Sequence, residues 1–524
     1  METKQITKSA ISVSIITMIS RVMGYIRDAV SAALLGVGMV SDAFFVAFRI
    51  PNLLRNLLAE GALSSAFVPV FTEYLEKKRK EDVWNLAANI LTLLTLLLIV
   101  ITVIGVLFAE YIVKIIAPGF SNDIAKFNLT VELTRYLFPF ILFVSIAALF
   151  LGILNSLKKF SIPAFAPVIL NISMICSGLF LCPALGDTPE KQVWGWVIGA
   201  LFGAFLEIVI QLIPAIKSGF KLKFVIDLKE KGLQKIIKLM IPATIGQSVT
   251  QINLLVNTIL ASLLTQGSVT YLYYGNRLMQ LPFGVFGVAI ATVSFTYISQ
   301  CAARKDYVGL GNIIHSSLKQ AFFIVLPASA GLIFLSLPIN ALLFHYGRFE
   351  YADTINTAKA SIMYCIGIFA FSGIKILTQV FYSIEKPDIA VKISVFSMIL
   401  NVILSIILMF PFKYLGLALA ASIAGIIQFF ILYYFVNKFI GNLKTKDLLI
   451  FSFKILIASI FMGIIVYLFY DFLNGEFNKI YSRFINGIIV FISIILGMII
   501  YFIFLKIFKL NEINSFFNSF LNRK

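Results

Sequence analysis

The chain has 524 residues, of which 60% are hydrophobic and only 13% are charged, and its formal net charge is +18. A soluble globular protein cannot cover its surface with so few charged residues, so this composition excludes one and indicates a protein that crosses a membrane many times. The basic excess does not indicate nucleic-acid binding, because Lys and Arg recur in every second predicted loop.

Apolar segments long enough to span a bilayer follow one another along the whole chain. A spanning helix takes roughly 20 apolar residues, and on that scale the sequence predicts about fourteen spans in an all-α polytopic membrane protein. The first segment contains charges that a cleaved signal peptide would exclude, so we expect it to be retained. The predicted spans are 10–36, 41–71, 84–116, 127–156, 162–183, 192–216, 236–265, 268–301, 314–345, 355–384, 388–411, 414–438, 447–473 and 484–508.

The loops differ in charge on the two sides of the predicted membrane. Residues 37–40, 117–125 and 265–268 carry no Lys or Arg. The alternate loops are basic, for example at Lys77 to Lys80 and at Lys217 through Lys238. Because cytoplasmic loops are the basic ones, we expect both termini in the cytoplasm and an even number of spans.

A weak internal repeat divides the sequence. Shifting the chain against itself by about 227 residues places the stretch that starts at Ser268 on the stretch that starts at Ser41, as two parallel six-helix repeats would require. Two final spans have no counterpart. We therefore predict a first lobe over 1–220, an interfacial amphipathic linker over 221–235, a second lobe over 236–440, and two extra helices with a cytoplasmic tail over 441–524.

Charged residues gather in the first two predicted spans. An ionisable group at the centre of a spanning helix costs on the order of 3 kcal/mol, so several together imply a polar cavity inside the helix bundle. The group comprises Arg21, Arg27 and Asp28 in the first span and Asp42, Arg49, Arg55 and Glu60 in the second.

Arginine in such a cavity suits a phosphate or carboxylate, because its planar fork makes paired, charge-assisted hydrogen bonds. Pro51 can kink the second span and redirect Arg55 inward. Asn52 lies beside the stripe of charged residues on this span. The repeat offset aligns Arg277 of the second half with Arg49 of the first. The second half has no equivalents of Arg21, Arg27 and Asp28. We therefore expect a mainly N-terminal electropositive wall and a large anionic substrate. The alternative for the acids is that they only pair with arginines and hold helices together.

Several function classes lack their sequence signatures. There is no GxxxxGK[ST] loop and no HExxH motif, which argues against an ATP-driven pump and against an enzyme. Four cysteines and two histidines have no metal-ligand or disulfide spacing, so we expect no cofactor and no metal site. A secondary transporter or flippase is what these observations favour.

The motifs themselves carry a resemblance. The stretches SRVMGYIRDAV from Ser20, SDAFFVAFRIPNLLRNLLAEGALSSAFVPVF from Ser41, NSLKKFSIPAFAPVILNISMI from Asn155 and YYGNRLMQLPFGVFGVAIATV from Tyr273 resemble the MurJ (MviN) lipid II flippases. The resemblance covers essentially the whole chain, including the two extra C-terminal helices.

This resemblance implies a member of the multidrug/oligosaccharidyl-lipid/polysaccharide exporter superfamily. It implies translocation of lipid II, the undecaprenyl-pyrophosphate-linked disaccharide-pentapeptide, across the bacterial cytoplasmic membrane to supply peptidoglycan synthesis. We expect alternating access through the cavity, with lipid II, membrane phospholipids and the cell-wall synthesis or division machinery as partners, no nucleic acid, and a monomer.

By motif, the resemblance also implies roles for single residues. It implies substrate binding by Arg21, Arg27, Arg55 and Arg277, gating or counter-ion roles for Asp28, Asp42 and Glu60, and further cavity positions at Arg49 and Asn52. Some relatives carry sodium-binding carboxylates where this chain offers only Asn257, Asn401 and Ser405, so we expect little or no sodium coupling there. Gln280 likewise replaces an acid near Arg277.

Three other functions compete with this one. A drug or cation antiporter of the same superfamily would need an acid-dominated cavity, which this sequence lacks. A flippase for another polyprenyl-linked glycan would fit the cavity charge, and only the motifs from Ser20 and Ser41 argue against it. A non-transporting scaffold would not need so many buried arginines.

Overall fold

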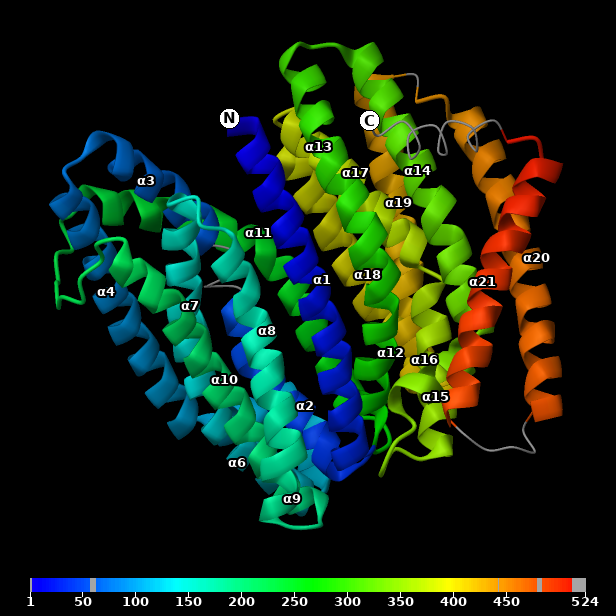
Figure 1. The fold of residues 1–524 in the computed structure, drawn as a ribbon, viewed down its shortest axis with the longest axis horizontal. Helices are drawn as coiled ribbons and strands as arrows, with labels where there is room; N and C mark the ends of the chain where they lie inside the picture. The colour runs from blue at the N-terminus through cyan, green and yellow to red at the C-terminus, as the bar shows by residue number, and fades with distance from the viewer. Residues whose placement is uncertain (1, 57–62, 442, 478–482, 511–524) are drawn as a thin grey trace. The chain divides into compact units, whose positions relative to one another are not determined.

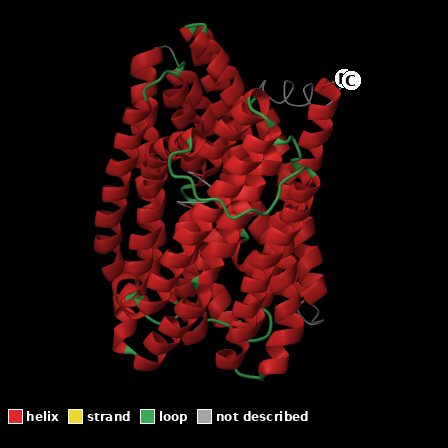
Figure 2. Ribbon diagram, turned by 90° about the vertical axis from the view of Figure 1, so that its left-hand side faces the viewer, coloured by secondary structure: helices red, strands yellow, loops and turns green. Residues whose placement is uncertain are grey.

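The computed structural model describes residues 2–56, 63–441, 443–477 and 483–510. These residues form helices joined by short connections, and none of them forms a strand (Figure 2). The chain divides into two compact units, the first containing residues 1–270 and 346–350, and the second containing residues 271–345 and 351–524.

The first unit contains the N-terminal helices, drawn from blue to green in Figure 1. Its elements are α1 (Glu2–Leu35), α2 (Met39–Arg55), α3 (Ser64–Lys77), α4 (Lys80–Leu107), α5 (Ala109–Ile116), the short η2 (Pro118–Asn122), α6 (Ile124–Leu137), α7 (Pro139–Ser156), α8 (Ser161–Cys176), the π-helical η3 (Ser177–Leu181), α9 (Cys182–Leu185), α10 (Pro189–Lys217) and α11 (Lys231–Ser262).

Helix α10 organises the packing of this unit, since it lies against both α7 and α8. Helix α1 packs along α8, α2 packs against α6, and α11 packs against α3. Aromatic side chains fill the space between α3, α4 and α7, where the rings of Phe67 and Phe71 stack at 4.9 Å and Phe150 meets Phe220 at 5.7 Å. Such aromatic burial fixes these helices to one another.

The second unit contains the remaining helices. They are α12 (Ser268–Pro282), whose first turn belongs to the first unit, the π-helical η4 (Phe283–Gly287), α13 (Val288–Ala303), α14 (Tyr307–Phe334), α15 (Ser336–Phe344), α16 (Tyr351–Cys365), α17 (Ile368–Ser383), α18 (Pro387–Phe412), α19 (Tyr414–Ile440), α20 (Thr445–Phe477) and α21 (Arg483–Ile507).

Its two last helices are part of the packed unit. Helix α20 lies along α14 and against α21. The hydroxyl of Tyr501 on α21 donates to the carbonyl of Phe323 on α14 at 2.7 Å, and both residues are buried. Buried aromatic residues such as Phe322 and Phe429 continue this core toward α19.

Proline and capping residues explain several helix boundaries. Pro139, Pro189 and Pro387 each stand at the start of a helix, where the missing N–H has no partner to lose. The Asp123 carboxylate accepts the backbone N–H of Lys126 at 3.1 Å at the start of α6, and the Asp306 carboxylate caps α14 in the same way. Predicted span 127–156 is therefore two helices, α6 and α7, which meet at Phe138.

In the part of the chain that the structure describes, ten helical segments are long and apolar enough to span a membrane, or eleven if α16 and α17, bent by 41° at their junction, count as one. Predicted spans 10–36, 41–71 and 236–265 fall outside this count. The first two carry the charges that led us to expect a cavity, and charges shorten an apolar run. The multi-span helical fold is confirmed, and the number fourteen stays a prediction.

The predicted lobe boundaries also stay predictions. Helix α11, which the repeat assigns to the second lobe, packs against α3, α4 and α5 of the first unit. The predicted linker 221–235 is not helical between residues 220 and 230, and α11 begins at Lys231.

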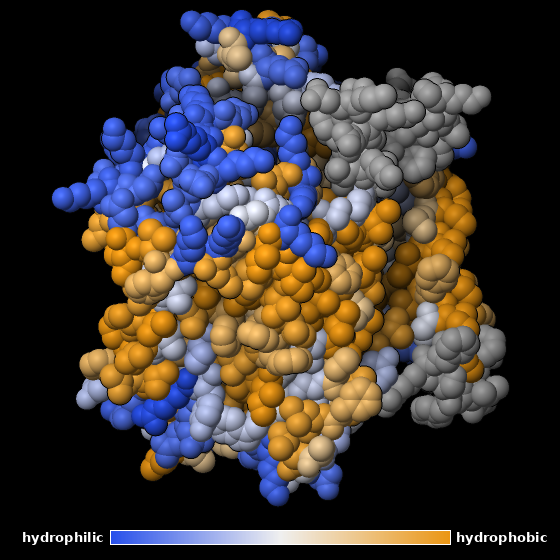
Figure 3. All heavy atoms as spheres, turned by 60° about the vertical axis from the view of Figure 1, so that its left-hand side comes forward, coloured by the Kyte–Doolittle hydropathy of each residue, from blue (hydrophilic) through white to orange (hydrophobic). Residues whose placement is uncertain are grey.

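The surface of the first unit is banded. On the face that Figure 3 shows, apolar residues form a broad zone with polar residues gathered beyond its two edges. Exposed Leu97, Val100 and Leu107 on α4 contribute to such a surface. An exposed apolar zone of this kind suits contact with lipid rather than with water.

Candidate functional site

The first two helices each carry one buried carboxylate. Asp28 is 2% exposed and Asp42 is 1% exposed. A buried carboxylate needs positive partners or several hydrogen bonds to stay charged. The two residues meet this need in different ways.

Asp28 pairs with its neighbour in the sequence. Its Oδ1 accepts from Nη2 of Arg27 at 2.7 Å and from Nε at 3.0 Å, so the guanidinium presents two donors to one oxygen. The Asp28 side chain is 3% exposed, whereas that of Arg27 is 15% exposed. The arginine therefore keeps part of its own surface accessible while it neutralises the acid.

Asp42 binds groups from distant parts of the sequence. Its Oδ2 lies 2.8 Å from Nζ of Lys126 and accepts the backbone N–H of Gly267 at 2.7 Å. Its Oδ1 accepts the backbone N–H of Thr270 at 3.0 Å and the hydroxyl of the same residue at 2.7 Å. A carboxylate in this position is favoured by the positive end of the dipole of α12, which begins at Ser268.

Lys126 is a residue that the sequence reasoning missed. It is 6% exposed and its ammonium also lies 4.0 Å from the centre of the Phe120 ring. It lies between a loop and a predicted span, so nothing in the charge pattern marked it as buried. The expected arginine partner of Asp42 is therefore not what the structure shows, since its cationic partner is this lysine from α6.

Arg49 links α2 to α11. Its Nη1 donates to the hydroxyl of Thr258, which is 1% exposed, and to the carbonyl of Leu254 at 3.4 Å. Thr258 also donates to that same carbonyl at 2.8 Å. Arg49 therefore has a structural connection within the first unit, alongside its candidacy as a cavity residue.

The other predicted residues of the first unit differ in exposure. Arg21 is exposed on α1, and Asn52 and Arg55 are partly exposed on α2. Pro51 lies inside α2 and the helix continues through it to Arg55. Glu60 lies outside the residues that the structure describes.

A short loop from later in the chain also reaches the end of α1. Nη1 of Arg348 donates to the carbonyl of Leu34 at 2.7 Å and to the side chain of Gln192 at 2.9 Å, and its backbone N–H donates to Ala33. Gly347 has a φ of +55°, and a Cβ there would collide with the Ala33 carbonyl. This contact was not predicted, because residues 346–350 lie in a predicted loop and no local pattern marks what such a loop binds.

Arg277 belongs to the second unit, where it is partly exposed on α12. On the same helix, Gln280 donates to the side chain of Asn276 at 2.6 Å. Lys375 on α17 is exposed within the bent pair of apolar helices. Because a lysine in a span usually faces water or another charge, Lys375 is a further candidate, which its place as the one charged residue of 360–384 could have signalled.

The residues considered for sodium belong to two different units. Asn401 and Ser405 are buried on α18, and Asn257 is on α11 of the other unit. Within the described residues, no group of three or more His, Cys, Asp or Glu side chains could hold a metal ion.

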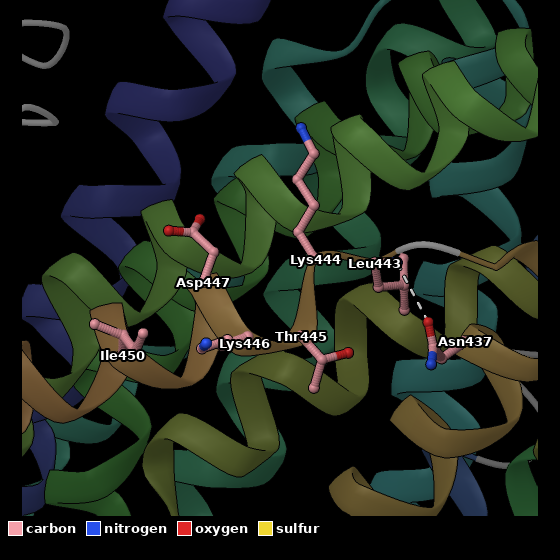
Figure 4. A pocket seen from close by; sticks show the side chains of 7 residues that line it. All are labelled: Asn437, Leu443, Lys444, Thr445, Lys446, Asp447 and Ile450. Carbon is pink, nitrogen blue, oxygen red and sulfur yellow. Dashed lines mark hydrogen bonds between the residues drawn. The ribbon is translucent and has the colours of Figure 1, made fainter.

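An open depression of about 520 Å³ lies elsewhere, at the junction of α19 and α20 (Figure 4). Its lining residues are Asn437, Leu443, Lys444, Thr445, Lys446, Asp447 and Ile450. None of the predicted site residues is among them. Asp447 is held by Lys319 at 2.6 Å and by His315 at 2.9 Å, both from α14, which fixes the start of α20.

The first unit carries three arginines with some exposure and one acid that is held by several donors. Arg27, Arg21 and Arg55 present guanidinium groups with some exposure, which can bind phosphate or carboxylate oxygens. Asp42 already has four donors and cannot easily accept more.

Comparison with known proteins shows which family the chain resembles. The family described as "Lipid II flippase MurJ" matches residues 31–486. A "Probable lipid II flippase MurJ" of Buchnera aphidicola subsp. Schizaphis graminum is 35% identical over 93% of this chain and 96% of its own length. One from Vibrio cholerae is 37% identical over 82% of each chain, and the "Lipid II flippase MurJ" of Burkholderia cenocepacia is 33% identical over 82% of this chain and 84% of its own.

Solved structures agree in fold. A structure described as "Lipid II flippase MurJ, inward closed conformation" has a TM-score of 0.77 and 29% identity, and the match covers 96% of this chain and all of that one. A multidrug resistance MATE family transporter of the MOP superfamily has a TM-score of 0.67 and 15% identity over 83% of this chain and 99% of that one. The second likeness concerns the fold alone.

Proposed function

The chain belongs to the MurJ family of lipid II flippases, and on that premise we propose that α1 and α2 form the anion-binding wall along which it moves lipid II. The protein is a transporter rather than an enzyme, and it serves the membrane step of peptidoglycan synthesis. Lipid II carries a pyrophosphate and a peptide with carboxylates, which are the groups that exposed arginines bind best.

The Arg27–Asp28 pair is the observation that carries the binding proposal. The acid is almost fully buried, whereas the guanidinium beside it keeps part of its surface accessible. A substrate phosphate can therefore reach the Arg27 guanidinium while it remains paired with Asp28. Arg21 and Arg55 in the first unit and Arg277 in the second supply further positive charge for a substrate with several anionic groups.

Asp42 has a different role in this proposal. Its bonds to Lys126, Gly267 and Thr270 join α2, α6 and the start of α12. With both termini in the cytoplasm, this cluster and the Arg348 loop lie at the outer end of the first unit. We place the outer gate here, held closed by Asp42 and opened when these bonds break during alternating access. Glu60 stays a candidate counter-ion, and Arg49 and Asn52 stay candidate cavity residues.

The remaining features of the proposal follow from sequence pattern. Fourteen spans would form two six-helix lobes plus two extra helices in the bacterial cytoplasmic membrane, with the basic loops inside. We propose a monomer whose partners are lipid II, membrane phospholipids and the cell-wall synthesis or division machinery.

The test is the appearance of lipid II in the outer leaflet of bacteria depleted of their own flippase. The parent chain should restore it, and the Arg27→Ala variant should reduce it at least tenfold at equal membrane level. Arg304→Ala, which removes an exposed arginine after α13, serves as the charge-matched control and should restore it fully.

Two results would count against the proposal. If the folded parent chain fails to restore outer-leaflet lipid II but restores the export of another polyprenyl-linked glycan, the substrate is wrong. If Arg27→Ala restores lipid II as well as the control does, the binding wall is not where we place it.

A further inference from the structure

The connection between α10 and α11 is an extended strap rather than a helix. We use "strap" for Lys221–Leu228, which runs beside α4 in the first unit. The backbone N–H of Asp227 donates to the Asn89 side chain at 2.9 Å, and the Asn89 amide donates back to the Asp227 carbonyl at 2.7 Å. The backbone N–H of Val225 donates to the Thr92 hydroxyl at 3.3 Å. These bonds to α4 fix the strap in position.

Both ends of the strap are also anchored. Before it, Phe220 is 1% exposed and its ring lies 6.0 Å from that of Trp84. After it, Glu230 caps α11 and accepts the hydroxyl of Tyr74 at 2.7 Å. Burial, aided by this carboxylate, raises the pKa of Tyr74 to about 12, so the hydroxyl stays a donor. The strap is thus a rigid edge.

Of the five apolar side chains of the strap, Val225 packs against the core of the first unit, and the other four do not. In an extended chain alternate residues point the same way, and here every second residue is apolar. These side chains are among the most exposed of the unit: Leu222 is 61% exposed, Phe224 76%, Ile226 53% and Leu228 65%. A row of large apolar side chains held outward by a fixed backbone requires a covering partner.

The position on α4 indicates which partner covers the row. Within the uncharged stretch Val83–Ala109, the run Ile90–Phe108 begins directly after Asn89 and contains 19 residues, none of them charged and none of them Asn or Gln. At 1.5 Å per residue this is roughly 28 Å, close to the thickness of the hydrocarbon core. Because Asn89 and Thr92 bind the strap, its backbone lies at the boundary between hydrocarbon and headgroups, with its apolar row beside the exposed side chains of α4.

The charges of the strap suit the lipid headgroups, which lie at this depth of the membrane. Lys221 and Lys223 are exposed between the apolar residues, and Lys217 and Lys229 flank them. Asp227 is the one acid of the strap, and its carboxylate accepts the backbone N–H of Lys229 at 2.9 Å. In Figure 3, polar residues gather directly beyond the edge of the apolar zone. Positive charge at this level attracts lipid phosphate.

We propose that the strap is a binding edge for anionic phospholipids, with Lys221 and Lys223 on the headgroup phosphates and Leu222 and Phe224 between the acyl chains. This role is independent of lipid II transport. Because the strap leads directly into α11, which packs on α3, anionic lipid would also stabilise the contact between these helices.

The test uses the purified full chain in detergent, with native mass spectrometry during titration by phosphatidylglycerol or by phosphatidylcholine of the same acyl chains. The parent should retain phosphatidylglycerol more strongly. Lys221→Gln with Lys223→Gln should weaken that retention by roughly fivefold for each lysine, without changing the phosphatidylcholine result. Leu222→Ser with Phe224→Ser should weaken retention of both lipids.

The control removes two exposed lysines beyond the other end of α4, by Lys114→Gln with Lys191→Gln, and should leave retention of both lipids unchanged. Equal retention of the two lipids by the parent, or equal loss in the strap and control variants, would overturn the proposal. So would a co-purifying protein that occupies the strap of the parent and is lost from the lysine variant. A shared unfolding midpoint verifies that all variants are folded.

Discussion

Asp28 and Asp42 are both buried carboxylates of the first unit, but their surroundings differ. Asp28 is neutralised by the adjacent Arg27, whose side chain is partly exposed. Asp42 is bound by groups from α6 and from the start of α12, far away in the sequence. From this difference we infer that a charged residue in a span can serve either ligand binding or helix association. The exposure of its partner separates the two roles.

The largest expected effect is at Asp42. Asp42→Asn leaves the Lys126 ammonium buried without a charged partner, which should reduce the free energy of unfolding by about 3–5 kcal/mol. Chemical or thermal unfolding in detergent measures it. The double variant Asp42→Asn with Lys126→Met should recover part of the loss, because the unpaired charge is gone. If Asp42→Asn were as stable as the parent, Asp42 would contribute no more than Asp28 to the free energy of unfolding.

Thr270→Val should have the next largest effect. It removes the 2.7 Å hydroxyl bond to the Asp42 carboxylate and leaves the backbone bond in place. A hydrogen bond to a charged group contributes about 1.5–3 kcal/mol, so the unfolding free energy should fall by that amount. Thr292→Val, which removes an exposed hydroxyl bonded only to its own helix, is the matched control and should be nearly neutral. Equal effects would contradict the importance of the Asp42 cluster.

Asp28→Asn should cost less, about 1 kcal/mol, because water can solvate the partly exposed Arg27 that remains. It should also leave binding of lipid II to the purified chain intact or stronger, since the guanidinium loses a competing anion. Unfolding and native mass spectrometry on one sample measure both quantities. A loss of stability as large as that of Asp42→Asn would remove the distinction between the two acids.

The smallest effect concerns an ion pair outside the spans. Glu73 is partly exposed and accepts from Lys235 at 2.6 Å and from Lys77 at 3.2 Å, and these lysines hold the pKa of its carboxyl below the usual range. A lowered pKa stabilises the fold above the unfolded pKa, and the gain is lost as the pH falls through the folded value. The unfolding midpoint of Glu73→Gln should lie slightly below that of the parent at about pH 7 and equal it at about pH 3. If the difference between the two unfolding midpoints grew as the pH falls, the prediction would be wrong.

Sequence pattern was most informative where the signal is local. Composition and apolar run length predicted a helical protein with many spans, and the motifs predicted the family. The adjacency of Arg27 and Asp28 made their pairing one of the foreseeable outcomes. The helix breaks at Pro139 and at the bend between α16 and α17 were not predicted, because an apolar run looks the same whether or not it is kinked.

Apolar run length and the placement of charge were enough to predict a membrane protein whose first two spans carry the charges, since burial of charge in hydrocarbon is costly wherever it occurs. Which charges meet depends on the packing of the helices. Lys126 lies far from Asp42 in the sequence, and the Arg348 loop lies farther still from the end of α1. No periodicity records such pairs, because they depend on how helices pack against one another rather than on any local preference of the chain.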